Sequence, residues 1–315
     1  MADRRSSRAS RLARATAFVL GLLALVGAAA ALAAEPAIAQ PGLFLAQQRC
    51  SDGMLEVAEP GCPGAAPQRA ADSMRMRRHD WPGPDGYQIE DSVLADDGAS
   101  YVTTMSFAPF GRFDASHGDG GEVYVVERGR VRIAITQDGG QMGVVQGFLG
   151  HECGGTGWIL FDQDAPSGHW ADMVAKLKGR PAGAACLATS HAYTRYRLQT
   201  VSVPFLIRGA STAISRPTII SEHFNAATLA RSTAMERFFL MQGVGRVIWE
   251  VWSRGDAGGP PPSDLARRCP GTAWSTPPAP GWRLSDCRYA TNLRPAGGSL
   301  SVDAYGWPPR GLTLP

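Results

Sequence analysis

The chain has 315 residues, of which 31 are basic, 28 are acidic, 37 are glycine and 23 are proline. Residues 1–39 hold five of the basic and two of the acidic residues, so the remainder carries 26 charges of each sign. This balance argues against a nucleic-acid partner or an anionic membrane surface, and the glycine and proline content disfavours long helices.

The first segment of the chain is typical of a secretory signal peptide. Five arginines precede an uncharged run at residues 16–34, and the small-x-small site Ala37-Ile38-Ala39 follows. We therefore expect residues 1–39 to be removed and the mature chain to begin near Gln40. The protein is then periplasmic or extracellular, with no transmembrane segment after cleavage. A membrane anchor is the alternative, because the uncharged run is about as long as a spanning helix.

Six cysteines in an exported chain predict disulfide bonds. Their spacing favours nearest-neighbour pairing, although other connectivities stay open, and this pairing joins Cys50 with Cys62, Cys153 with Cys186, and Cys269 with Cys287. Metal binding is the alternative use of these residues. It is disfavoured because the chain has no Cys-x-x-Cys, and His151-Glu152-Cys153 has no second ligand pair at zinc-site spacing. No metal site is therefore predicted.

The residue pattern of the chain changes between its two predicted parts. Residues 40–95 lack sustained periodicity, so we expect an N-terminal extension stapled by the first disulfide. Residues 96–315 form the main domain and end in a Pro/Gly-rich segment. Short β-branched and aromatic runs bounded by turn residues predict strands at residues 101–107, 122–127, 131–136, 142–148, 158–161, 193–206, 218–224, 234–240 and 246–252. Hairpin-short links such as Arg128-Gly129-Arg130 make successive strands antiparallel neighbours.

One helix is predicted, over residues 169–178. Apolar residues recur there at i, i+3, i+4 and i+7, namely Trp170, Met173, Val174 and Leu177. Many hairpin-spaced strands with a single short helix indicate an all-β fold, specifically an antiparallel β-sandwich of the jelly-roll type. A parallel α/β fold is excluded, because it needs a helix after each strand.

The long strands carry candidate ligand-binding residues. A sheet face that mixes arginines, carboxylates and tryptophans is suited to sugars, since aromatic rings stack on them and charged groups bind their hydroxyls. The predicted ligand-binding residues are Arg195, Arg197, Arg246, Glu250 and Trp252. The partner is then a polysaccharide or a cell-surface glycan. The alternative is a solvated face with cross-strand Glu/Arg pairs.

Catalysis stays open. Carboxylates on three consecutive strands are spaced so that a pair can reach the roughly 5–9.5 Å separation of a glycosidase, and a histidine adds a proton-transfer group. The catalytic candidates are Glu222, Glu236, Glu250 and His223, with His191, Tyr193 and Tyr196 as further candidates for lyase chemistry. No cofactor is predicted. Asp114, Asp119, Glu122, Asp162 and Asp164 lie in turn-rich segments, and calcium is the alternative at one of these, residues 113–121.

The strands Ile-Ser-Glu-His-Phe at 220–224, Met-Glu-Arg-Phe-Phe at 235–239 and Arg-Val-Ile-Trp-Glu-Val-Trp at 246–252 carry a family resemblance. In them, and in texture over residues 101–307, the chain resembles secreted bacterial concanavalin A-like sandwiches of the lectin and glucanase type. The resemblance implies a jelly roll with a concave glycan-binding face. The Glu-x-Asp-x-x-Glu strand of laminarinase-like enzymes is absent, so no catalytic residue is carried over.

Three functions follow from these patterns, in order of preference. The first is glycan recognition on a sheet face, which needs only a groove. The second is a secreted polysaccharide hydrolase or lyase that uses carboxylates of that face. The third is a structural cell-envelope protein, which needs only a stable disulfide-bonded surface.

Overall fold

The computed structural model describes residues 38, 40–51, 55–57, 60–67, 74–79, 88–94, 98–106, 120–137, 145–147, 157–178, 180–181, 185–186, 188–207, 210–255, 260, 265, 275–289 and 294–299. All of them belong to one unit, Ala37–Pro315. Apart from Ile38, the predicted signal peptide lies outside the described residues.

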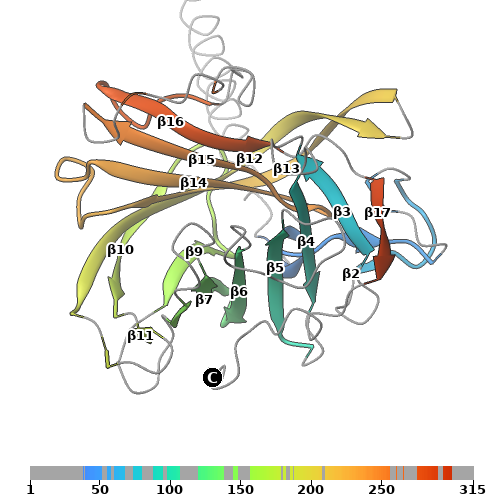
Figure 1. The fold of residues 1–315 in the computed structure, drawn as a ribbon, viewed down its shortest axis with the longest axis horizontal. Coiled ribbons are helices and arrows are strands. Elements are labelled where there is room, and N and C mark those ends of the chain that lie inside the picture. The colour runs from blue at the N-terminus through green and yellow to red at the C-terminus, as the bar shows by residue number, and fades with distance from the viewer. Residues whose placement is uncertain are drawn as a thin grey trace, which may run out of the picture. The chain divides into compact units, whose positions relative to one another are not determined.

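Six strands from the C-terminal half of the chain form one sheet, with the order β10-β12-β13-β14-β15-β16 (Figure 1). Every neighbouring pair in it is antiparallel. The strands are β10 (Ala171–Leu177), β12 (Ser190–Ile207), β13 (Ala210–Phe224), β14 (Ala234–Met241), β15 (Gly245–Arg254) and β16 (Trp282–Tyr289).

A nine-stranded sheet has the order β11-β8-β7-β6-β5-β4-β3-β17, with β9 paired to β7. Its strands are β3 (Met74–His79), β4 (Gln88–Leu94), β5 (Ser100–Ser106), β6 (Gly120–Glu127), β7 (Arg130–Gln137), β8 (Val145–Gly147), β9 (Trp158–Asp162), β11 (Arg180–Pro181) and β17 (Arg294–Ser299). A 3-10 turn, η1 (Pro41–Phe44), and the short pair β1 (Gln48–Arg49) and β2 (Ala66–Pro67) complete the described elements.

The all-β, antiparallel prediction is confirmed, and each predicted strand overlaps a strand of the structure. The link between β6 and β7 is a two-residue turn in which Arg128 (φ 52°) and Gly129 (φ 77°) both adopt positive φ. Such turns match the twist of hairpin strands. Four strands, β1 to β4, lie inside the predicted N-terminal extension, and β4 pairs with β5 across its boundary at residue 95.

The helix predicted over residues 169–178 is wrong, because residues 171–177 form strand β10. Ala175 and Leu177 of β10 are buried, whereas Val174 is 51% exposed. The predicted apolar pattern consists of two pairs of residues spaced i, i+4. Residues with this spacing share a face in a helix, and they also share a face in a strand, where side chains alternate every second residue. Hydrogen-bonded pairing of this segment with β12 makes it a strand.

Both faces of the six-stranded sheet are apolar at their centre. Ile219 and Phe238 belong to a core cluster that also contains Val131 and Phe161 of the nine-stranded sheet. The opposite face contributes to a second cluster, which includes Ile220, Phe239 and Ile248. Charged residues in the long strands are therefore placed among buried neighbours and need partners.

The Cys50–Cys62 disulfide is present, as nearest-neighbour pairing predicts. Cys186 and Cys287 are also disulfide-bonded. Cys153 and Cys269 lie outside the described residues, so the remaining two pairings stay predictions.

Candidate functional site

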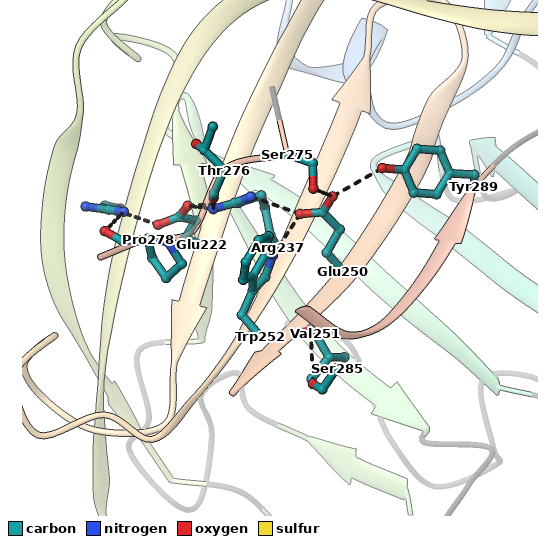
Figure 2. Close-up of polar contacts among 11 residues, drawn as sticks. Glu222, Arg237, Glu250, Val251, Trp252, Ser275, Thr276, Pro278, Ser285 and Tyr289 are labelled. Carbon is teal, nitrogen blue, oxygen red and sulfur yellow. Dashed lines mark hydrogen bonds and ion pairs between the residues drawn. The ribbon is translucent and has the colours of Figure 1, made fainter. Parts of the chain in front are cut away.

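A buried ion network joins strands β13, β14 and β15, on the same face as the apolar residues Ile220 and Phe239. Arg237 of β14 lies directly opposite Glu222 of β13 and Glu250 of β15, so the three side chains share one face. Arg237 Nε donates to Glu222 Oε1 (2.8 Å) and Nη1 donates to Glu250 Oε2 (2.9 Å). Figure 2 shows this guanidinium between the two carboxylates. All three residues are buried.

The carboxylate of Glu250 is saturated by protein donors. Oε2 accepts a hydrogen bond from Trp252 Nε1 (2.9 Å) in addition to that from Arg237. Oε1 accepts from Ser275 Oγ (2.6 Å) and from the Tyr289 hydroxyl (3.3 Å), as Figure 2 shows. Four donors on one buried carboxylate leave it no lone pair for a ligand.

Residues 275–278 lie against this network and form one wall of the site. Besides the bond from Ser275, Arg237 Nη2 donates to the Thr276 carbonyl (2.7 Å) and Arg195 Nη2 donates to the Pro278 carbonyl (3.2 Å). Two guanidiniums thus fix the backbone of a Pro-containing segment through charge-assisted hydrogen bonds.

A pocket of about 150 Å³ opens beside the network. Its lining combines three guanidiniums, one carboxylate and an indole ring, and consists of Trp170, Arg195, Arg197, Ile220, Glu222, Arg237, Thr276, Pro277 and Pro278. We refer to it as the arginine pocket. The guanidinium carbons of Arg195 and Arg197 each lie 4.4 Å from the centroid of the Trp170 ring, at cation–π distance. Thr276 and Pro277 are exposed and form its rim.

The three arginines of the pocket differ in their partners. Arg195 Nε forms an ion pair with Glu222 Oε2, and Arg237 occupies Oε1 of the same carboxylate. Arg197 Nε, in contrast, is buried without a hydrogen-bond partner among the described residues. Burial lowers the pKa of Arg197, with the charges of Arg237 and Arg195 acting in the same direction and Glu222 opposing them. Arg197 is thus a half-buried cation whose Nε has no hydrogen-bond partner among the described residues.

The structure brings together five residues of the predicted face, and separates two from it. Arg195, Arg197, Glu222, Glu250 and Trp252 lie on the face of Arg237, as the register of β12 to β15 and the bond from Trp252 to Glu250 establish. The pocket and its network use all five.

Arg246 does not share this face, so its predicted alignment with Glu250 is wrong. A bulge shifts the β14–β15 register between Phe239 and Leu240, so Arg246 lies opposite Leu240. Its guanidinium points to the other side of the sheet and donates from Nη1 to Glu122 Oε2 of β6 (2.9 Å). Glu122 also accepts from the Tyr124 hydroxyl.

His223 and Glu236 lie opposite one another across β13 and β14, and alternation places them on the reverse face from Glu222 and Arg237. His223 is buried between Trp158 and Phe238, with ring centroids 5.0 and 5.1 Å from its own. Burial lowers the pKa of His223 to about 3. The catalytic candidates are therefore divided between two faces, and only Glu222 and Glu250 remain together.

The segment of the calcium alternative, residues 113–121, lies outside the described residues except for its last two glycines, so that alternative stays a prediction. Glu122 is bonded to Arg246 and Tyr124, and Asp162 accepts from Arg130 (2.9 Å). Within the described ranges, no group of three or more His, Cys, Asp or Glu side chains is placed to hold a metal ion.

Sequence reasoning missed part of the site. Trp170 was assigned to the core face of a helix, and its contact with Arg195 and Arg197 depends on β10 being a strand. Ser275 and Thr276 reach the network from a segment far along the chain, for which the sequence holds no signal beyond its prolines.

Within the described part of the chain, no helix is long and apolar enough to cross a membrane. Comparisons with protein-family models, curated proteins and solved structures found no match.

Proposed function

We propose that this chain is an exported glycan-recognition protein that binds a polysaccharide or cell-surface glycan at the arginine pocket. The observation that carries the proposal is the pocket itself, in which Arg195 and Arg197 are held against Trp170 beside a sheet face. Guanidiniums present several donors in a fixed plane, which suits the hydroxyl and acidic groups of sugars. Contacts with the ring and the network hold these donors in place before the ligand arrives, which lowers the entropy cost of binding.

The burial of the carboxylates favours recognition over hydrolysis. A general acid must reach the leaving-group oxygen, and a nucleophile must reach the anomeric carbon. Glu222 and Glu250 instead direct their oxygens to Arg195, Arg237, Trp252 and other protein donors. Their role is to orient the arginines of the face.

Lyase chemistry is likewise disfavoured. A tyrosine base must ionise near neutral pH, but burial raises the pKa of Tyr196 to about 12 and also raises that of Tyr193. Tyr196 is buried in the core cluster that contains residues of both sheets. Of the candidate histidines, His223 lies on the reverse face, whereas His191 is exposed on β12, on the face of Arg195 by alternation.

We further propose that the two sheets form a jelly-roll sandwich of the concanavalin A-like type. The antiparallel sheets support this fold, as does the core cluster that contains side chains of both sheets. Export is supported by the arginine-rich start with its uncharged run and by the disulfide-bonded cysteines, which are typical of an oxidising compartment.

The test is glycan-array binding by the disulfide-bonded mature protein, compared with the variants Arg197→Gln and Arg231→Gln. Arg197 lines the pocket, whereas Arg231 is exposed on the β13–β14 link and serves as the matched control. We expect array signals that Arg197→Gln removes and Arg231→Gln retains. Release of reducing ends or unsaturated uronates from the bound polysaccharides would instead identify an enzyme, and no binding together with no turnover would leave the envelope-structural role.

A further inference from the structure

The charges at the arginine pocket do not balance. Three guanidiniums line it, with one carboxylate, Glu222, whose two oxygens are already taken by Arg195 and Arg237. The adjacent carboxylate, Glu250, is turned toward Arg237, Trp252 and two hydroxyls. These five charged groups therefore carry one excess positive charge, and Arg197 is the cation for which no carboxylate remains.

Among the described residues, no carboxylate of a neighbouring strand is bonded to Arg197. On β10, Asp172 lies opposite Arg195, and its carboxylate accepts a hydrogen bond from the Tyr193 hydroxyl. On β13, the residue opposite Arg197 is the apolar Ile220. Arg197 therefore lines the pocket without a carboxylate bonded to it among the described residues, and its Nε is buried without a hydrogen-bond partner.

We propose that the arginine pocket binds the acidic group, a carboxylate or a sulfate ester, of an anionic polysaccharide, with Arg197 as its principal ligand. This inference rests on the proposed glycan-binding function and specifies the class of glycan. A planar guanidinium binds an oxyanion through two parallel N–H donors, and the guanidinium of Arg197 is one of the three that line the pocket. The anion would neutralise the excess positive charge of the pocket.

The pocket dimensions fit one acidic group with part of its sugar ring. Its volume of about 150 Å³ is several times the ~30 Å³ share of one water molecule in the liquid. Because Thr276 and Pro277 form an exposed rim, the polymer chain can continue on either side while one residue enters. A neutral sugar of the same shape would leave the Arg197 cation without a counterion.

The experiment uses calorimetric titration of the mature, disulfide-bonded protein with oligogalacturonate as the carboxylate probe. The matched ligand is the fully methyl-esterified oligomer, which keeps the backbone and removes the charge. A sulfated galactan oligomer and inorganic sulfate form two further arms, which distinguish carboxylate from sulfate ester and a glycan from a free ion. The protein variants are Arg197→Gln, Arg197→Lys and the control Arg231→Gln.

We expect an acidic oligomer to bind at least about tenfold more tightly than its neutral counterpart, as befits a hydrogen bond to a charged group. Arg197→Gln should abolish this preference, Arg197→Lys should retain part of it, and Arg231→Gln should leave it unchanged. Equal binding of free-acid and esterified oligomers would overturn the acidic-group site while leaving glycan recognition intact. Binding of inorganic sulfate at the Arg197 guanidinium, followed by its ¹⁵N NMR signals, without binding of any oligomer would overturn glycan recognition alone.

Discussion

At the residue scale, hydrogen bonding determines which nitrogen of His223 carries its proton. Ser221 Oγ donates to the Leu160 carbonyl (2.5 Å), so its oxygen accepts the bond from His223 Nε2 (2.9 Å). The neutral Nε2–H tautomer therefore leaves Nδ1 as a bare lone pair, and Nδ1 has no partner among the described residues. Protonation would create a buried cation and an N–H without an acceptor, which explains the lowered pKa of His223.

This arrangement predicts acid sensitivity. The pKa of His223 is about 3 in the folded protein against about 6.5 for a free histidine, so between these values the unfolded chain binds the additional proton. Stability then falls as pH falls from about 6.5 toward 3, by about 1.4 kcal/mol per pH unit from this group. Urea unfolding across this range should show a shallower slope for His223→Gln. His191→Gln, at an exposed position, is the control for loss of a histidine. Parallel slopes for the wild type and His223→Gln would contradict the assignment.

At the element scale, strand alternation could be predicted from sequence wherever it was uninterrupted. It correctly grouped Glu250 with Trp252 and Arg195 with Arg197. It placed Arg246 on the wrong face, because a bulge depends on how two strands pair and one strand's sequence does not show it. The burial of the carboxylates was also beyond prediction, since the covering segment at 275–278 is distant in sequence.

Strand β10 offers a direct test of strand against helix. Val174 and Ala175 are adjacent, and β10 places Val174 in solvent and Ala175 in the core, where it is 1% exposed. Val174→Glu should therefore change the free energy of unfolding by no more than about 0.5 kcal/mol, as is usual on a surface. Ala175→Glu should cost at least about 2 kcal/mol, because it buries an unpaired carboxylate. Thermal unfolding of both variants measures the difference. A costly Val174→Glu with a harmless Ala175→Glu would favour the helical face.

At the scale of the whole molecule, the core includes a residue from the predicted cleavage site. Ile38 is 6% exposed, belongs to the core cluster that draws on both sheets, and donates its amide to the Gln163 carbonyl (2.8 Å). Cleavage after Ala39 would remove this residue from the folded protein. The sequence also contains an earlier small-x-small site, Ala31-Leu32-Ala33, and cleavage there retains Ile38. The two small-x-small sites are equivalent in local composition, and the burial of Ile38 favours cleavage at the earlier one.

If the chain is exported as proposed, we accordingly expect its mature form to begin upstream of Ile38. Burial of an isoleucine side chain is worth about 1.5–3 kcal/mol, so a chain that starts at Ala37 should exceed one that starts at Gln40 by roughly that amount in free energy of unfolding. Urea unfolding of the two chains measures this difference, and Ile38→Ala in the longer chain separates the side chain from the added backbone. N-terminal sequencing of the exported protein should place its first residue before Ala37. A first residue at Gln40, with equal stability of both chains, would show that the Ile38 contact contributes nothing to the mature fold.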